Sequence, residues 1–280
     1  MPMKVDWSSH WYDQQGNSRY DATLREARKE QLLPSPSGVA NVLAKPGIQN
    51  WKLNEMMKVA YSIPVAEGET RDSWETRVAD EFEVVTSVGR NLGTEIHDLV
   101  EDYLTGTIIN LENASVPAIN VFVNAKIWID EFLDLDQEVI SEAVVVNLED
   151  GYAGRLDILS QLKGDPGPKS FIGEGKMALV DLKTQNIKEY RNKATPNYYD
   201  EWKWQLAAYW KAYETKNPGT IGRVGSFVVS TNPDWPIARC KWYTKEELEK
   251  YYEQFKYLLG MWRIMKNFPF KLVEAVNEKV

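Results

Sequence analysis

Hydrophobic positions along the chain follow two different periods, and the change from one to the other divides the sequence. In NLGTEIHDLVEDYL (residues 91–104) the apolar residues recur at three- and four-residue steps, which indicates an amphipathic helix. EAVVVN (142–147) and GRLDIL (154–159) are instead rich in β-branched and aliphatic residues and flank the turn residues EDG. The pattern therefore predicts helices first and a β-hairpin after them.

The second half of the chain continues with both kinds of element. Further predictions are a helix at 117–135, a strand at 177–183, a helix at 201–214, a strand at 225–230 and a last helix from Thr244, with Glu247 completing a capping box, to about Met265. Three consecutive strands, a helix and another strand predict an α/β core with a mixed sheet. That order does not fit a doubly wound nucleotide-binding fold, in which strands and helices alternate.

The first 90 residues are predicted to be a mostly helical extension. Prolines and glycines interrupt the helical pattern in LLPSPSG and at Pro46-Gly47. The predicted helices lie at 20–31, 37–60 and 74–83. We therefore expect a helical extension at 1–90 that packs on a core at 91–280.

Composition is typical of a globular protein. A chain of 280 residues with 43% hydrophobic and 26% charged residues suits one large domain, or one domain with an extension. Cys240 is the only cysteine, which excludes an internal disulfide and a multi-cysteine metal cluster. No segment has the length and apolarity of a membrane span, and MPMKVDWSSH lacks a signal-peptide pattern. We expect a soluble intracellular protein, in the cytoplasm of a cell or of a phage-infected host.

The overall charge limits how the chain could hold nucleic acid. A net charge of −8 and a pI of about 5.1 argue against binding by bulk electrostatic attraction. A local basic segment is nevertheless present at 183–193, where four basic residues meet only Glu189, a net charge of +3. Such a segment is either a solvated face or a contact for phosphates.

Two aspartates and a lysine form the candidate chemistry. In ALVDLKT (178–184), Asp181 and Lys183 share one face of a strand, and the apolar residues share the other. These residues could be a strand end at which Lys183 meets solvent and pairs with Asp181. Asp157, however, lies in the preceding strand, and two carboxylates on one face require a cation between them. Oxygen ligands suit Mg²⁺ or Mn²⁺ better than zinc.

These residues resemble a known nuclease pattern. Asp157, then Asp181-Leu182-Lys183, then Gln205-x-x-x-Tyr209 resembles the P-D-(D/E)-x-K nuclease superfamily, and more closely its RecB-like exonuclease branch. In that branch an upstream helix supplies a histidine (here His97), and the first strand often carries a glutamate (here Glu142).

The resemblance covers about residues 91–230. More loosely, PSPSGVANVLAKPGIQNW (34–51) is similar to the N-terminal part of the mitochondrial genome maintenance exonuclease group. Two departures from the pattern are visible. Leu156 stands where the superfamily has proline, and the four-cysteine iron–sulfur site of some relatives is impossible here.

The resemblance implies a restriction-endonuclease-like core, with a central mixed β-sheet flanked by helices, and a metal-dependent DNA exonuclease acting on single-stranded ends. It implies that Lys183 positions the attacking water and that Gln205 and Tyr209 orient Lys183 or contact the DNA backbone. The implied ligands of Mg²⁺ or Mn²⁺ are His97, Glu142, Asp157, Asp181 and the carbonyl of Leu182. The residues expected to contact DNA are Arg155, Lys188, Arg191 and Lys193, with the N-terminal helices lining the channel.

Each of these residues also has a structural interpretation. His97 could be a hydrogen-bonded core histidine, Tyr209 a packing residue, Glu142 a solvent-facing strand residue and Arg155 a salt-bridge partner. Two other functions remain open, a structure-specific endonuclease with the same site and a non-catalytic DNA-binding protein of the same fold. The sequence does not decide cleavage polarity, DNA against RNA, the number of metal ions or the oligomeric state.

Overall fold

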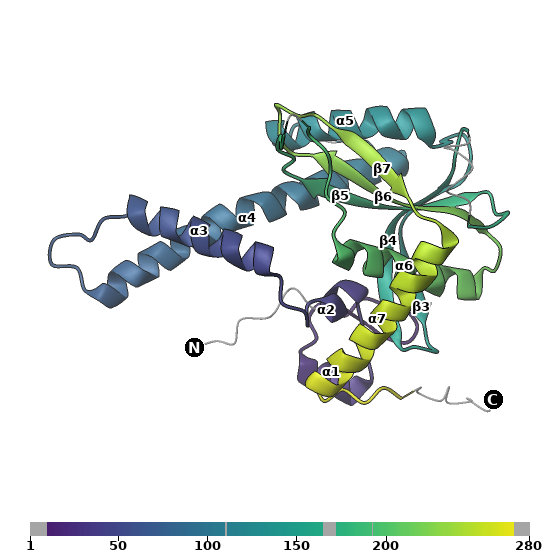
Figure 1. Cartoon of the computed structure of the whole chain (residues 1–280), viewed down its shortest axis with the longest axis horizontal. Helices are drawn as coiled ribbons and strands as arrows, with labels where there is room; N and C mark the ends of the chain where they lie inside the picture. The colour runs from purple at the N-terminus through teal and green to yellow at the C-terminus, as the bar shows by residue number, and fades with distance from the viewer. Residues whose placement is uncertain (1–9, 110, 165–171, 192, 272–280) are drawn as a thin grey trace.

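The centre of the fold is a five-stranded mixed sheet (Figure 1). The computed structural model describes residues 10–109, 111–164, 172–191 and 193–271. In spatial order the strands are β3 (Val139–Asn147), β4 (Tyr152–Gln161), β5 (Met177–Gln185), β6 (Ile221–Ser230) and β7 (Ala238–Trp242). This sheet confirms the predicted α/β core. The sequence pattern did not predict β7, because its five residues include Arg239 and Lys241 and none of them is fully buried.

The connections explain why the sheet is mixed. β3, β4 and β5 follow one another antiparallel, as in the predicted hairpin and its extension. β5 and β6 are parallel, since α6 (Asp200–Lys216) lies between them in sequence and supplies the crossover that a parallel pair needs. β7 then returns antiparallel to β6.

Helices cover both faces of the sheet, and each face has its own hydrophobic core. α4 (Arg71–Leu104) and α5 (Val116–Phe132) pack on one face, and α6 and α7 (Lys245–Met265) pack on the other (Figure 1). On β5, Val180 and Leu182 belong to the core beneath α4 and α5, whereas Leu179 belongs to the opposite core. Alternation along the strand therefore directs Asp181 and Lys183 toward the α6 side.

The N-terminal segment joins the core on the α6 and α7 side. It forms β1 (Trp11–Tyr12), α1 (Leu24–Glu30), β2 (Leu33–Pro34) and α2 (Pro36–Ala40), and β1 pairs antiparallel with β2. Trp11 stacks on Phe268 with ring centroids 5.5 Å apart and also contacts Trp262 of α7. These aromatic contacts hold the beginning of the described chain against its end.

α3 (Pro46–Ser62) and the first part of α4 form an arm, residues 46–90, that projects away from the sheet (Figure 1). α4 is one helix of 34 residues, so the separate helices predicted at 74–83 and 91–104 were wrong as separate elements. Gly89 lies inside the helix without breaking it, at a cost of about 1 kcal/mol relative to alanine. Pro46 begins α3 rather than interrupting a helix, because proline is tolerated in the first turn.

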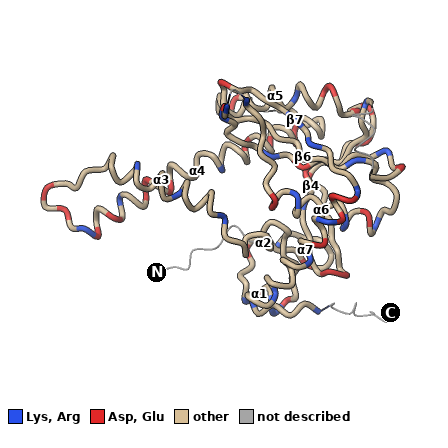
Figure 2. Tube along the Cα trace, in the orientation of Figure 1, with Lys and Arg blue, Asp and Glu red and all other residues tan. Residues whose placement is uncertain are grey.

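The arm is acidic, although it adjoins the candidate site. Residues 46–90 contain eight acidic and five basic residues, and both kinds occur along the arm (Figure 2). Arg77 bridges Glu69 at 2.7 Å and so closes the turn between the two helices. The boundary expected between residues 90 and 91 falls inside α4, and the division into two parts stays a prediction. No helix among the described residues is long and apolar enough to cross a membrane.

Candidate metal and catalytic site

Three neighbouring strands bring three carboxylates to one level of the sheet. The register of β3 and β4 places Glu142 opposite Asp157, and continuing the register of β4 and β5 places Asp157 opposite Asp181. Regular strand pairing is interrupted at both places. The interruption leaves main-chain and side-chain groups at this level free to make other contacts.

Asp157 takes over part of the missing strand pairing. Its Oδ2 atom accepts a hydrogen bond from the main-chain N–H of Leu182 at 2.6 Å. Its Oδ1 atom lies 4.0 Å from Nδ1 of His97 on α4. The carboxylate is therefore fixed from the β5 side and faces the imidazole with its other oxygen.

The backbone of Glu142 is strained. Its φ angle is +56°, in the left-handed region, which costs a residue with a side chain about 1–2 kcal/mol. Ser141 donates its hydroxyl hydrogen to the main-chain oxygen of Asp157 at 3.1 Å, and Arg155 Nε lies 2.5 Å from Glu142 Oε2. These contacts hold the Glu142 side chain beside Asp157 in spite of the strain. Strained residues of this kind cluster at functional sites.

His97, Glu142 and Asp157 together form a possible metal-binding group. One ligand atom from each lies within 4.8 Å of the others. Burial, with a further contribution from the positive charge of Lys183, lowers the pKa of His97 to about 4, so the imidazole is neutral at pH 7 and can offer a lone pair. Two carboxylates and one imidazole form a donor set that Mn²⁺ and Mg²⁺ accept.

Asp181 has a different environment from the other two carboxylates. It is fully buried, and Lys183 Nζ donates to its Oδ1 atom at 2.9 Å. The Oδ2 atom lies 2.8 Å from the same ammonium but receives no directed hydrogen bond from the described residues. Because Asp181 Oδ2 lacks a directed hydrogen bond from the described residues, it is available to contact a bound cation. The role of Asp181 as a ligand, and that of the Leu182 carbonyl, stay predictions.

Burial raises the pKa values of all three carboxyl groups, and repulsion from Asp157 adds to it at Glu142 and Asp181. Burial, with Asp157 as a further cause, raises the pKa of Glu142 to about 7 against the opposing effect of Arg155. Burial also raises the pKa of Asp157, and it raises that of Asp181 to about 6. Burial alone would lower the pKa of Lys183, but Asp181 and Asp157 outweigh it and the pKa is raised. A divalent cation would favour the ionised carboxylates.

His97, Glu142 and Asp157 line an open cavity of about 510 Å³, which we call the carboxylate cavity. Of the residues predicted from the sequence, seven line it: His97, Glu142, Arg155, Asp157, Lys183, Gln205 and Tyr209. The segments that bring them together are α4, three neighbouring strands and α6. Residues more than one hundred positions apart in sequence thus share one cavity.

Gln205 and Tyr209 lie one turn apart on α6. The Gln205 amide donates to the Tyr209 hydroxyl oxygen at 2.8 Å. A Cβ atom at Gly154 would lie 2.4 Å from the Tyr209 ring, so the glycine of the G-x-x-D sequence makes room for that ring beside β4. Tyr209 is therefore both a packing residue, 4% exposed, and part of the cavity wall.

The residues expected to contact DNA lie in two different places. Lys188, Arg191 and Lys193 line a pocket of about 560 Å³ that does not include the carboxylates. Arg155 lies instead in the carboxylate cavity, where it pairs with Glu142. The basic residues of segment 183–193 are thus divided between the carboxylate cavity, which Lys183 lines, and a separate pocket.

Several cavity residues were missed by sequence reasoning. Asp98 and Glu101 of α4 line the cavity, and the helical spacing from His97 to Glu101, one turn, could have identified Glu101. His10, Tyr12, Ser35 and Ser37 also line it, but nothing in their sequence spacing connects them with residues beyond position 90. Trp202 lies one turn before Gln205 and was not singled out.

Comparisons with known proteins find distant likenesses. No family model matches the chain, and no curated protein matches it. A solved structure named "Putative exonuclease" from Eubacterium rectale is 13% identical, with a TM-score of 0.41 over 63% of this chain and 68% of that chain. The structure of SSO0001 is 12% identical, with a TM-score of 0.29 over 64% and 75%. Likenesses at this level do not determine what the chain does.

The strain at Glu142 predicts that glycine is more stabilising than alanine at this position, the reverse of the usual order within a strand. Both Glu142→Gly and Glu142→Ala remove the carboxylate and the partner of Arg155, so their difference isolates the backbone. We expect the Gly variant to be the more stable by about 1 kcal/mol in chemical denaturation, because glycine adopts positive φ freely. At Val144, on the same strand with ordinary φ, the Ala variant should be the more stable by about 0.5–1 kcal/mol. If alanine were the more stable variant at both positions, the backbone of Glu142 would not be strained.

Proposed function

We propose that the chain is a metal-dependent DNA exonuclease that hydrolyses phosphodiester bonds at single-stranded ends. The observation that carries the proposal is the grouping of His97, Glu142 and Asp157 within 4.8 Å, beside the Lys183–Asp181 ion pair. Phosphodiester hydrolysis with a divalent cation needs ligands for the ion and a fixed positive charge near the phosphate. The order of these residues in the sequence, which resembles that of RecB-like nucleases, supports the same conclusion.

Mg²⁺ or Mn²⁺ would be held by Asp157, Glu142 and His97, with Asp181 and the Leu182 carbonyl as further ligands. Such an ion lowers the pKa of water and neutralises charge on a phosphate. The charged residues of the cavity suit a site that binds both a cation and a phosphate. Its lining residues include four carboxylates, against three basic side chains from Lys183, Arg155 and Arg90.

Lys183 would act on the attacking water and on the charge that develops at phosphorus. Asp181 holds the ammonium, and the Lys183 side chain is 17% exposed and lines the cavity. Its raised pKa keeps it charged, because Asp181 and Asp157 outweigh the effect of burial. A charge fixed before the reaction stabilises a transition state without reorganisation.

Gln205, Tyr209 and Arg155 would position the substrate. The hydrogen bond from Gln205 to Tyr209 fixes both polar groups on the cavity wall. Arg155 is 44% exposed on its side chain and could exchange Glu142 for a phosphate when the glutamate binds an ion. Guanidinium groups are well suited to phosphate because they donate two parallel hydrogen bonds.

The proposed path of DNA is short. Lys188, Arg191 and Lys193 offer three positive charges in a pocket of their own, whereas the arm carries a net charge of −3. We therefore propose that phosphates contact the basic pocket and the base of the arm, where Arg90 lines the cavity, and not the arm tip. A short contact also suits a chain with net charge −8.

Metal binding should be visible in thermal unfolding. Adding Mn²⁺ or Mg²⁺ should raise the melting temperature, because a ligand that binds only the folded state stabilises it by about 2.7 kcal/mol at one hundred times its Kd. Asp157→Asn should abolish the rise, and the exposed Asp136→Asn should retain it. A melting temperature that both ions leave unchanged would count against the site.

Lys183→Ala separates a catalytic lysine from a structural one. In the catalytic case single-turnover cleavage of DNA should fall by about 10²-fold or more, the scale for one preorganised electrostatic contact. The ion-induced rise in melting temperature should remain, and Lys188→Ala should have a smaller effect on the rate. A Lys183→Ala protein that cleaves at nearly the wild-type rate would leave Lys183 only as the ion-pair partner of Asp181.

Substrate topology separates the two nuclease alternatives. A linear end-labelled single strand should be degraded in the presence of Mn²⁺, and a covalently closed circle of the same sequence should be spared. Gel electrophoresis of both strands after equal times gives the comparison, with Asp157→Asn as the inactive control. Rapid cutting of the circle would favour the endonuclease, and cutting of neither strand would favour a non-catalytic DNA-binding protein.

A further inference from the structure

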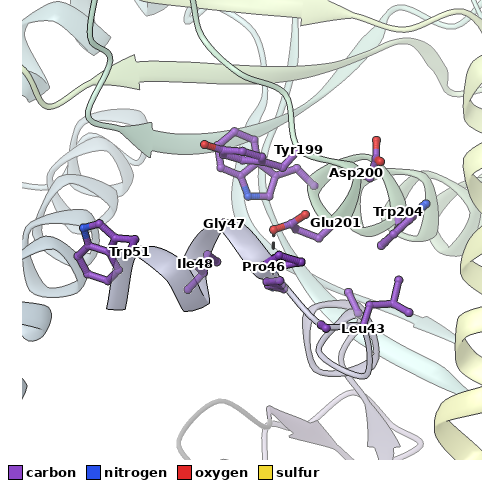
Figure 3. A pocket seen from close by; sticks show the side chains of 13 residues that line it. Leu43, Pro46, Gly47, Ile48, Trp51, Tyr199, Asp200, Glu201 and Trp204 are labelled. Carbon is purple, nitrogen blue, oxygen red and sulfur yellow. Dashed lines mark ion pairs between the residues drawn. The ribbon is translucent and has the colours of Figure 1, made fainter. Parts of the chain in front are cut away.

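A second cavity adjoins the carboxylate cavity and is lined by aromatic side chains. It has a volume of about 720 Å³ and lies between the first turns of α3 and α6 (Figure 3). We call it the aromatic pocket, after Trp51 of α3 and the residues Tyr199, Trp202 and Trp204 at the start of α6. Trp202 lines both cavities, so the two share a wall.

The rings of the aromatic pocket are accessible and partly fixed. Trp51 is 46% exposed and Tyr199 is 45% exposed, so about half of each side chain is open to a ligand. Tyr199 and Trp202 meet edge to face with centroids 4.8 Å apart, and the Trp204 indole N–H donates to Gln254 at 2.8 Å. Rings held in this way offer flat faces at a small entropic cost to a flat ligand.

The charges of the aromatic pocket do not favour a phosphate, and they suit a ligand that donates hydrogen bonds. Its charged lining residues are Asp200, Glu201 and Lys45. Lys45 lies 3.7 Å from Glu201, and Lys203 Nζ lies 2.8 Å from Asp200 Oδ1. Both lysines are thus already paired, so the lining offers a phosphodiester no uncompensated positive charge. Carboxylate oxygens accept hydrogen bonds from the amino and imino groups on the edges of nucleobases. A planar group that carries N–H donors and no phosphate therefore fits the lining.

The spacing along α6 connects this pocket with the proposed chemistry. Trp202, Gln205 and Tyr209 lie at three- and four-residue steps and so on one face of the helix. The rise from Trp202 to Tyr209 is about 10 Å. That distance is roughly three nucleotides of a stacked single strand. A base close to a phosphate in the carboxylate cavity can therefore reach the aromatic pocket.

We infer that the aromatic pocket binds one unpaired nucleobase of the strand whose phosphodiester lies in the carboxylate cavity. This inference rests on the proposed function and deepens it. A base within a duplex has its faces stacked and its hydrogen-bonding edge paired, so only an unpaired base can enter. The pocket would thus select single-stranded ends by taking one base out of the strand, while the carboxylate cavity holds the backbone.

Oligonucleotides with a single abasic nucleotide test the inference. The abasic position is moved one nucleotide at a time along a single strand, and kcat/KM for cleavage at a defined bond is measured with Mn²⁺. Wild-type protein should lose about tenfold at one position within three nucleotides of that bond, the scale of one base–aromatic stack. Trp51→Ala should lose about as much on the intact strand and lose no more at that abasic position.

Two further variants test the aromatic pocket without removing Trp51. Gly47 lines the pocket, and a side chain added there would have no atom within 4 Å of its Cβ, so Gly47→Phe can fill the pocket without displacing an existing contact. It should abolish the abasic effect and retain the ion-induced rise in melting temperature. Tyr61→Ala, on the same helix and 93% exposed, should behave like wild type throughout.

The outcomes separate the inference from the proposed function. If wild-type protein cleaves no single strand with Mn²⁺ or Mg²⁺, the proposed function fails. If it cleaves but every abasic position gives the same rate, the base pocket is overturned and the nuclease stands. The base pocket is overturned as well if Trp51→Ala and Gly47→Phe slow intact and abasic strands by equal factors.

Discussion

Repulsion between like charges is the constraint around which this structure is organised. Glu142, Asp157 and Asp181 are brought to one level of three adjacent strands, and burial makes their mutual repulsion expensive. Each carboxylate has a different compensating contact: the guanidinium of Arg155, the main-chain N–H of Leu182 and the ammonium of Lys183, respectively. The raised pKa values indicate that these contacts only partly offset the cost of burying the three negative charges. A bound cation would offset the rest.

The rest of the fold places the other groups around this level. α4 passes close to the end of β5, since a Cβ atom at Gly93 would lie 3.2 Å from Thr184 Oγ1, and the helix thereby carries His97 to the carboxylates. α6 is the crossover of the parallel pair β5 and β6, so its inner face lies over the same strands and brings Gln205 and Tyr209. The topology of the β-sheet and its helices therefore determines which side chains surround the carboxylates.

Charge is distributed in a way that suits a narrow contact with an anionic polymer. The chain carries −8 overall and the arm is acidic, so bulk attraction cannot hold a long stretch of DNA. Three basic side chains line a separate pocket, and aromatic side chains line the pocket that adjoins the carboxylate cavity. In the proposed function, backbone contacts and base contacts are thereby assigned to two cavities that share Trp202.

The sequence alone determined the α/β class and the hairpin, and it predicted Asp157, Asp181 and Lys183 as candidates on neighbouring strands, because strand periodicity and side-chain alternation are local properties. It did not determine that α4 is continuous, since glycines and weak apolar periodicity near residue 90 resemble a boundary. Nor did it determine the left-handed backbone of Glu142, the pairing of Arg155 or the aromatic pocket. Those features arise only when α3, α6 and three strands meet, because each depends on contacts between residues far apart in the chain.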